Sequence, residues 1–293
     1  IVITIRFRER QQKRINNYLQ RELDKRKREV VIQRDQLERK NKDITDSINY
    51  AKCIQTAILP VPEEMDEALP GSFIFFRPRD IVSGDFYWFN TYSDKALIAC
   101  ADATGHGVPG AFMSIIGGTV LQDTLSLKEI NSPSDVLFRL DREVRKLLSA
   151  DKGDDNPRDG MDISICEVDL KSKEVRIASA MRPVIVFKDG EEMYLKGSRN
   201  PIGGGYSEEK DFSMTTLQLS SGDMVFMFSD GYPDQFGGPE GKKFKIARFR
   251  EMLAFLHDKP KDIQQNTLAS TLDKWMGETS QIDDIIIMGI RIP

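Results

Sequence analysis

The sequence LIACADATGHG, residues 97–107, places an aspartate between an apolar run and a glycine-rich turn. A short continuous run of apolar residues predicts a buried β-strand. Asp102 therefore leaves the end of a rigid strand, and the glycines after it let the backbone and a ligand approach each other closely. We expect such a carboxylate to serve chemistry rather than packing.

Three further acidic motifs stand where predicted strands begin or end, and they contain Asp85, Asp230 and the pair Asp283-Asp284. Each motif alone is more readily explained as a turn, because Asp-Gly is a common turn pair. Together they are harder to explain in that way, because converging carboxylates repel each other unless cations bind them. Three or four carboxylates that meet usually hold a divalent metal, often two ions. Spacing alone does not show that they meet.

From residue 71 onward the chain alternates short β-type runs with a few helical segments. The expected strands are 72–76, 85–89, 96–101, 161–168, 174–178, 184–188, 212–219, 224–228 and 285–292, and the expected helices are 110–127, 134–148, 245–256 and 261–276. Ser134 is the expected N-cap of its helix. This order lacks a regular βαβ alternation. The sequence therefore predicts an α+β fold, a β-sandwich of mainly antiparallel sheets flanked by helices.

A long helix is expected to precede this fold, because no proline or glycine occurs from residue 6 to residue 59. Apolar residues recur every seven positions as in a coiled-coil seam, but Lys27, Arg34 and Asn41 occupy the alternate seam positions. We favour a weak homodimeric coiled coil that regulates the chain by changing register, over a solvated helix packed on its own domain. The expected domains are 1–60 and 61–293.

Charge and composition restrict the function. The chain has a net charge of −4, with 15 basic and 8 acidic residues up to residue 60. This balance argues against a nucleic-acid partner. Three separated cysteines exclude a disulfide framework, and two histidines exclude a His-rich metal site, so a metal would be held mainly by carboxylates, as Mg²⁺ or Mn²⁺ prefers.

No apolar run approaches the length of a membrane helix. The apolar residues 1–5 precede Arg6, Arg8 and Arg10, as at the cytoplasmic edge of a membrane span. We therefore expect a longer parent protein with a cytoplasmic location. It would be attached to the inner membrane only through an upstream segment.

Six motifs together resemble one family. They are SGDFYW, ADATGHGVPGAFMS, DGMDIS, PIGG, GDMVFMFSDGYPDQFGG and DDIIIMGI. In this order they resemble the SpoIIE-type branch of the metal-dependent protein phosphatases, the superfamily of protein phosphatase 2C. The resemblance covers about residues 45–293, although Cys53 stands where a basic residue is expected.

The resemblance implies a site with two Mn²⁺ or Mg²⁺ ions and a metal-activated water that hydrolyses phosphoserine or phosphothreonine. The positions that match the family's metal ligands are Asp85, Asp102, the main-chain carbonyl of Ala103, Asp230 and Asp283. Asp284 is the less favoured ligand of its pair. The implied substrate is a phosphoprotein, by family analogy a STAS-type anti-anti-sigma regulator.

Several roles stay open from the sequence. His106 is a candidate proton donor to the leaving group, and Arg79 a candidate contact for the substrate phosphate. Asp162 in DGMDIS is a candidate ligand of a third metal, or only part of a turn. The alternatives to a protein phosphatase are a catalytically silent docking or dimerisation module of the same fold, and a hydrolase of small phosphate esters.

Overall fold

A computed structural model describes residues 2–125, 132–148, 159–204 and 210–293, with side chains from residue 10 onward in the first helix. The chain divides into two compact units, residues 1–50 and 51–293. Each unit is described by itself. In the described part of the chain, no helix combines the length and apolar character needed to cross a membrane.

The first unit consists of the larger part of one continuous helix, α1 (Val2–Ile58). The last turns of this helix, after residue 50, belong to the second unit. The prediction of a long helix is confirmed. Leu23, Val30, Leu37 and Ile44 repeat every seven residues and are 47% to 62% exposed. The helix thus presents an unpartnered apolar seam to solvent in the single chain. The predicted domain boundary between residues 60 and 61 stays a prediction.

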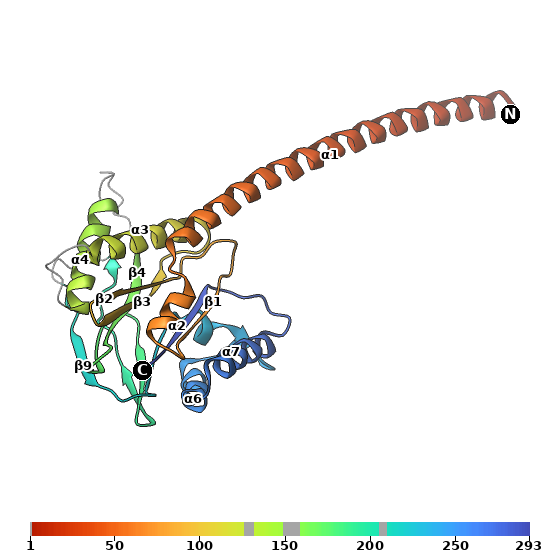
Figure 1. Cartoon of the computed structure of the whole chain (residues 1–293). Helices are drawn as coiled ribbons and strands as arrows, with labels where there is room; N and C mark the ends of the chain where they lie inside the picture. Colours follow the sequence, from red (N-terminus) through yellow and green to blue (C-terminus); the bar gives the residue numbers. More distant parts are fainter. Residues whose placement is uncertain (1, 126–131, 149–158, 205–209) are drawn as a thin grey trace. The chain divides into compact units, whose positions relative to one another are not determined.

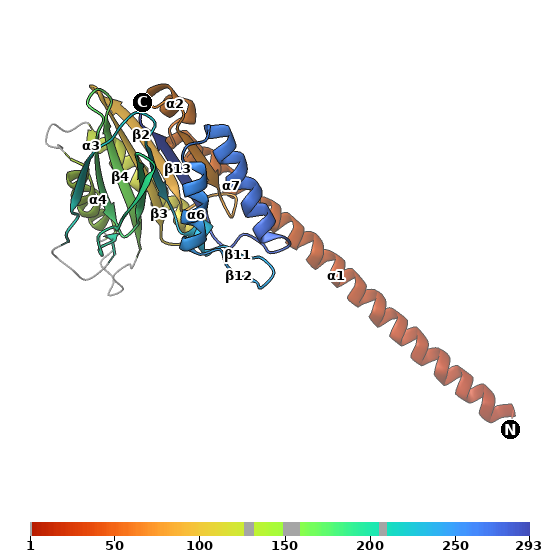
Figure 2. The same cartoon turned by 90° about the horizontal axis from the view of Figure 1, so that it is seen from below.

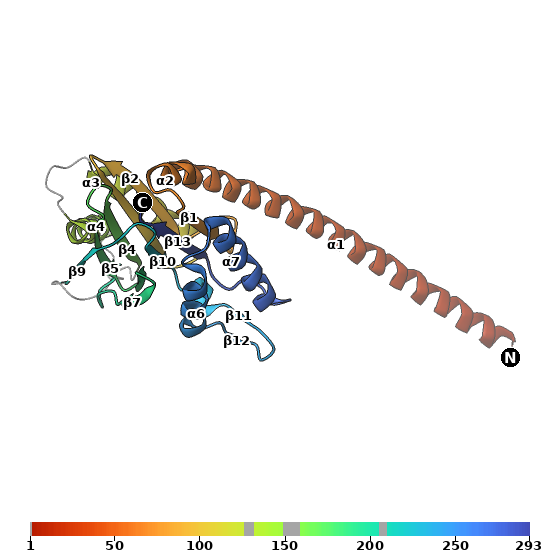
Figure 3. The same ribbon diagram turned by 60° about the horizontal axis from the view of Figure 1, so that its bottom comes forward.

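The second unit is built on two antiparallel sheets. The six-stranded sheet has the order β2 (Phe86–Tyr92), β3 (Lys95–Ala103), β4 (Gly160–Asp169), β5 (Glu174–Ala180) and β9 (Met214–Gln218), with β8 (Ile202–Gly203) paired to β4. The five-stranded sheet has the order β1 (Phe73–Arg77), β13 (Ile285–Arg291), β10 (Met224–Phe228), β6 (Val184–Lys188) and β7 (Glu191–Leu195). A short ribbon of β11 (Phe236–Gly237) and β12 (Lys242–Lys243) lies beside α6 (Ile246–Leu256) (Figure 3).

Helices cover the outer face of each sheet, so the unit has four layers (Figures 1 and 2). The helices α3 (Val108–Leu125) and α4 (Pro133–Leu148) pack on the six-stranded sheet, and α6 (Ile246–Leu256) and α7 (Lys261–Met276) pack on the five-stranded sheet. The two shorter helices are α2 (Pro62–Ala68) and α5 (Gly231–Asp234). The predicted α+β sandwich flanked by helices is confirmed.

Strand β3 shows why the central strands read as continuous apolar runs. Ile98 and Cys100 point into the core between the sheets, whereas Leu97, Ala99 and Ala101 point toward α3 and α4. Successive side chains of a strand alternate between its faces, and here both faces are buried. The same arrangement explains the apolar run of β10, where Val225 and Met227 face the sandwich core.

Elements missed from the sequence are short or lie at edges. The edge strand β7 carries Glu191 and Glu192 and therefore lacks an apolar run. Helix α2 was missed although Pro62 stands at its start, a position that proline favours. The prediction of Ser134 as the N-cap of α4 is wrong, because Ser132 Oγ accepts the Asp135 amide and Ser134 Oγ donates to the Phe212 carbonyl. The predicted end of α3 at Leu127 lies outside the described residues.

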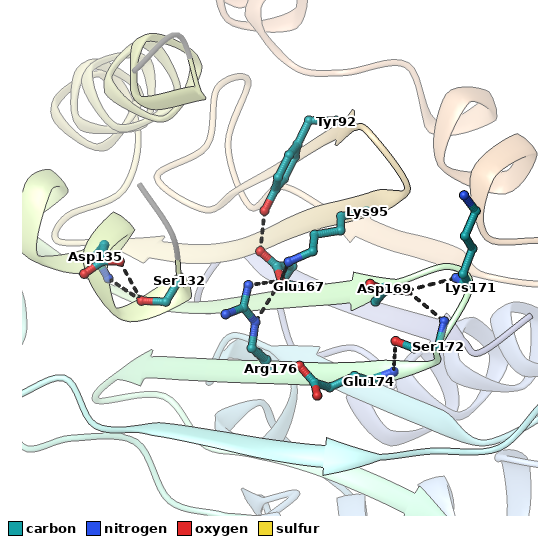
Figure 4. Close-up of polar contacts among 10 residues, drawn as sticks. All are labelled: Tyr92, Lys95, Ser132, Asp135, Glu167, Asp169, Lys171, Ser172, Glu174 and Arg176. Carbon is teal, nitrogen blue, oxygen red and sulfur yellow. Dashed lines mark hydrogen bonds and ion pairs between the residues drawn. The ribbon is translucent and has the colours of Figure 1, made fainter. Parts of the chain in front are cut away.

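One buried carboxylate outside the acidic motifs, Glu167, lies in a network of polar contacts (Figure 4). Glu167 of β4 accepts hydrogen bonds from the Tyr92 hydroxyl, from Lys95 Nζ at 2.9 Å and from Arg176 Nε at 2.8 Å. Burial alone would raise the pKa of Glu167, but these three donors hold it below its usual value. Its charge is fully compensated, so the network is structural.

We predict that Glu167→Gln lowers the free energy of unfolding at pH 7 by about 2 kcal/mol, because it removes the charged partner of two partly buried cations. The stabilisation from a depressed pKa is present above the unfolded value and is lost as pH falls through the folded one. The difference from wild type should therefore shrink below about pH 4. Urea unfolding at both pH values measures it, with the exposed Glu174→Gln on β5 as control. If the stability difference between Glu167→Gln and wild type did not depend on pH, Glu167 would not be a charged partner of Lys95 and Arg176.

Candidate active site

The acidic motifs meet at one end of the sandwich. Core-facing positions alternate along each strand, and at this end the alternation continues into acidic side chains. Asp85 continues the core face of β2, Asp102 and Asp162 those of β3 and β4, and Asp284 that of β13. Asp102 and Asp162 stand directly opposite each other in the β3–β4 register. The apolar core of the sandwich thus ends in carboxylates. The acidic rim is the set of Asp85, Asp102, Asp162, Asp230, Asp283 and Asp284.

Arg182 joins carboxylates from both sheets. It lies in the turn that carries the chain from β5 in one sheet to β6 in the other. Its Nη2 is 2.5 Å from Asp102 Oδ2 and 3.3 Å from Asp162 Oδ2, and its Nη1 is 2.9 Å from Asp230 Oδ2. The structure therefore brings Asp102 and Asp230 together, as the family resemblance implies, places the candidate Asp162 beside them, and adds Arg182.

Asp85 is the most deeply buried member of the predicted set. Its side chain is 3% exposed, and its Oδ2 has no hydrogen-bond partner among the described residues. Burial raises its pKa well above the usual value, and the negative charge of Asp102 raises it further, although a hydrogen bond from Ser229 opposes the rise. An unpartnered, buried carboxylate oxygen beside a second carboxylate is an environment that favours a cation.

Asp102 titrates in a similarly charged environment. Burial raises its pKa to about 7; Arg182 lowers it, and Asp230, Asp162 and Asp283 raise it. The buried Glu167 shows the opposite result, because its neighbours are donors and cations (Figure 4). Within the described ranges, Arg182 is the one cation that forms ion pairs with Asp102, Asp162 and Asp230. The rim therefore carries more negative charge than its own cation neutralises.

These residues fit a divalent cation by their chemistry. As they stand, the described residues contain no group of three or more His, Cys, Asp or Glu side chains in a metal-holding arrangement, and three of the carboxylates pair with the Arg182 guanidinium. Carboxylate and main-chain oxygens are nevertheless the donors that Mg²⁺ and Mn²⁺ prefer. The residues that could hold such ions are Asp85, Asp102, the Ala103 carbonyl, Asp230 and Asp283.

Asp284 has a structural role. It is fully buried, and its two oxygens accept the main-chain amides of Arg79 at 2.7 Å and Gly84 at 2.8 Å. Both oxygens are thus used to join the segment after β1 to the turn before Asp85. Asp283 next to it is exposed, with Oδ1 accepting the Asp284 amide. This arrangement supports the expectation that Asp283 is the ligand of the pair.

A buried glutamine holds the loop that carries Asp283. Gln235 belongs to the GYPDQFGG motif and is completely buried. Its Oε1 accepts the Ile282 amide at 3.1 Å, and its Nε2 donates to the Ser280 carbonyl at 3.1 Å. The motif therefore fixes the approach of the chain to the acidic rim.

His106 and Arg79 lie at the exposed side of the rim. His106 is half exposed, with Nδ1 3.3 Å from Asp80 Oδ2. Partial burial raises the pKa of Asp283, and the charge of His106 opposes this, so His106 lies near Asp283. Arg79 donates from Nη1 to the Ile282 carbonyl at 2.8 Å. The proposed proton donor and phosphate contact both stay predictions.

Gln55, in the last turn of α1, is a contact that the sequence did not reveal. Its Nε2 donates to the Ser83 carbonyl and to Ser114 Oγ, both at 2.6 Å, and its Oε1 accepts the Ser83 amide at 3.2 Å. Ser83 lies two residues before Asp85, and Ser114 lies on α3. One side chain therefore links α1, α3 and the turn that positions a candidate ligand.

Arg182 also escaped the sequence analysis. The available signal is an Arg-Pro pair between two apolar strands, with Ala180 before it and Val184 after it. In an antiparallel sandwich, the connection that follows β5 emerges at the same end as the start of β4, where Asp162 lies. Only the order of the strands would have predicted that Arg182 lies at the same end of the sandwich as Asp162.

Comparison with known proteins agrees with this fold. The family model for Stage II sporulation protein E (SpoIIE) matches residues 92–293. The SiaA-PP2C domain of Pseudomonas aeruginosa has a similar structure, with a TM-score of 0.78 and 33% identity, covering 86% of this chain and 98% of that one. The phosphatase domain of SpoIIE from Bacillus subtilis, solved with a fragment of its regulatory domain, has the same fold, with a TM-score of 0.58 and 20% identity over 75% of this chain and 61% of that one.

Among curated proteins, phosphoserine phosphatase RsbU of Bacillus subtilis (strain 168) is 28% identical over 193 residues, which are 64% of this chain. The matched part is 54% of RsbU, so the comparison spans about half the length of that relative. The fold and the acidic rim define a PP2C-type phosphatase domain. The chain belongs to the SpoIIE family.

We predict that Gly110→Ala destabilises the protein by about 1–3 kcal/mol, because a Cβ at Gly110 would stand 2.2 Å from the Gly105 carbonyl oxygen and 2.8 Å from Gly84 Cα. Both neighbours are backbone in the turns beside Ala103 and Asp85. The matched change on the same helix, Gly118→Ala, meets only Ile58 Cγ2 at 3.2 Å and should cost less than about 1 kcal/mol. Thermal unfolding compares the two, and equal losses would contradict the close packing.

A second prediction concerns Gln55→Leu, which removes the side-chain acceptor of the Ser83 amide. Hydrogen exchange at that amide should become faster, and unfolding should cost about 1–3 kcal/mol less, because buried polar groups lose their partners. Gln20→Leu, on the exposed part of α1, is the control. Unchanged exchange at Ser83 would show that Gln55 does not hold the turn.

Proposed function

We propose that this chain is a metal-dependent phosphatase that hydrolyses phosphoserine or phosphothreonine on a regulatory protein. The observation that carries the proposal is the convergence of Asp85, Asp102 and Asp230 at the end of the sandwich, with one internal cation among them. Membership of the SpoIIE family and the likeness to PP2C domains support it.

In this proposal Asp102 and Asp85 bind divalent cations from the six-stranded sheet, and Asp230 and Asp283 bind them from the five-stranded sheet. When bound, Mn²⁺ or Mg²⁺ ions supply positive charge for the phosphoryl oxygens and make a water molecule acidic enough to attack near neutral pH. Ser229 orients Asp85 by a hydrogen bond. The Asp284 carboxylate fixes the two neighbouring loops.

Three possible protein nucleophiles at this end of the sandwich, Cys100, Ser229 and Thr104, are poorly suited to attack. Burial raises the pKa of the Cys100 thiol well above its usual value, and the charges of Asp85 and Asp102 add to the rise. A thiol kept protonated is a poor nucleophile. Ser229 Oγ accepts the Ile286 amide, and Thr104 Oγ1 is bonded to the main chain of Gly160. Attack by water agrees with this arrangement.

The substrate class is proposed from relatives. RsbU is named a phosphoserine phosphatase, and we extend this activity to the present chain, with a STAS-type regulator as the substrate that the family resemblance implies. A catalytically silent module of the same fold is less favoured, because all four positions predicted to supply a carboxylate ligand still carry Asp. The cytoplasmic location and an upstream membrane attachment are part of the proposal.

Homodimerisation through α1 is also proposed. The exposed seam of Leu23, Val30, Leu37 and Ile44 supplies the apolar side of a coiled coil. Lys27, Arg34 and Asn41 weaken one register of that coil. A change of register would then reach the acidic rim through the last turn of α1, where Gln55 binds the turn before Asp85.

The proposal predicts metal-dependent release of phosphate from a phosphoserine peptide, with Mn²⁺ or Mg²⁺ and not in EDTA. Asp102→Asn should lower the rate by at least about a hundredfold, because it removes a charged ligand. Asp94→Asn, in the β2–β3 turn at the opposite end of the sandwich, should keep full activity. Hydrolysis of an aryl phosphate and of a nucleotide beside the peptide tests the substrate class. Equal activity of Asp102→Asn and wild type would refute the proposed site.

A further inference from the structure

We infer that Arg182 is the internal counter-cation of the acidic rim, which competes with divalent cations for the same carboxylate oxygens and thereby sets their affinity. The inference rests on the proposed metal-dependent function. It assigns a role to a residue from the β5–β6 turn that belongs to none of the predicted ligand motifs.

The contacts of the guanidinium support competition. Arg182 occupies Oδ2 of Asp102 and Oδ2 of Asp230, and both residues are candidate metal ligands. The pairs are short and join the two sheets, so the guanidinium lies among the oxygens that the ions need. Two cations cannot share these oxygens without strong mutual repulsion in a buried site. Binding of metal therefore requires the guanidinium to withdraw.

The backbone at Arg182 is fixed, so withdrawal involves the side chain. The Arg182 amide donates to the Ala180 carbonyl at 2.8 Å, and the Arg182 carbonyl accepts the Ser179 hydroxyl. Gly197 packs so closely that a Cβ there would stand 2.7 Å from the Arg182 carbonyl oxygen. A long side chain on an immobile backbone can exchange one position for another without a change in the fold.

The guanidinium is also held incompletely. Arg182 Nε is buried and has no hydrogen-bond partner among the described residues. Arg176 provides a contrast, because both its Nε and its Nη2 donate to Glu167. Arg176 satisfies one carboxylate that two cations surround, whereas Arg182 faces three carboxylates alone. The charge of Glu167 is therefore compensated by its cations. The three aspartates around Arg182 keep a net negative charge that attracts a further cation.

The competition has opposite consequences for the two forms of the protein. Without metal, Arg182 reduces the repulsion among Asp102, Asp162 and Asp230, and so stabilises the fold. With metal, the ions perform this neutralisation, and the contribution of Arg182 disappears. Removing the charge should therefore destabilise only the metal-free protein and should strengthen metal binding.

The test compares Arg182→Met with wild type, using Mn²⁺ alone as the probe. Titration calorimetry should show Mn²⁺ bound about tenfold more tightly by the variant. The melting temperature of the variant should fall in EDTA and should recover to near the wild-type value in saturating Mn²⁺. Arg176→Met is the matched control, and it should lower the melting temperature equally with and without Mn²⁺ and leave the affinity unchanged.

Unchanged or weaker Mn²⁺ binding by Arg182→Met, or an equal loss of stability in EDTA and in Mn²⁺, would overturn the inference. Arg182→Lys provides a second variant if the methionine protein does not fold in EDTA, and its affinity should lie between the other two. Mn²⁺ binding that is identical in all three would remove the inference and leave the proposed function intact. Absence of Mn²⁺ binding by the wild type would remove both.

Discussion

Mutual repulsion among buried carboxylates is the constraint on which the rest of this domain depends. Asp85 and Asp102 lie at the end of a dry sandwich, where burial raises the pKa of both side chains. Holding such groups together costs free energy, and the extended apolar packing of two sheets and their covering helices supplies it. The site is thus locally destabilising, and the surrounding core offsets this cost, as is common at functional sites.

Charge compensation separates structural from functional acidic groups in this chain. Glu167 is surrounded by a hydroxyl and two cations, and its pKa is lowered. Both oxygens of Asp284 accept hydrogen bonds from main-chain amides, and Asp284 so joins two loops. Asp85 retains an oxygen without a partner among the described residues. Burial is common to all three, so the partners of a carboxylate, and not its depth, identify it as a candidate ligand.

Sequence reasoning predicted the parts of this structure that depend on local patterns. The apolar run of β10 is bounded as expected, and the helix at residues 261–276 begins and ends as predicted. The strand ends suggested Asp102 and Asp230 only one by one, and the family resemblance implied that they meet; in the structure both pair with Arg182. Edge strand β7 was missed because its composition is polar.

Contacts between distant segments were not predictable from the sequence. Arg182 meets Asp102 only because β5 pairs with β4, and β4 with β3, in one register. Gln55 meets Ser114 across 59 positions of the chain. No local propensity encodes either contact. Both follow from the order and register of strands, which many small packing terms determine together.

Because the acidic rim is divided between two sheets, the spacing of its carboxylates depends on how the two sheets pack against each other. Asp102 and Asp162 move with the six-stranded sheet, whereas Asp230 follows β10 of the five-stranded sheet. A slight sliding of one sheet over the other would change the spacing of these oxygens before it disturbed any backbone hydrogen bond. Ile98 and Met227 lie in the core between the sheets and carry no charge. Their packing nevertheless fixes the relative position of the two sheets, and with it the spacing of the carboxylates.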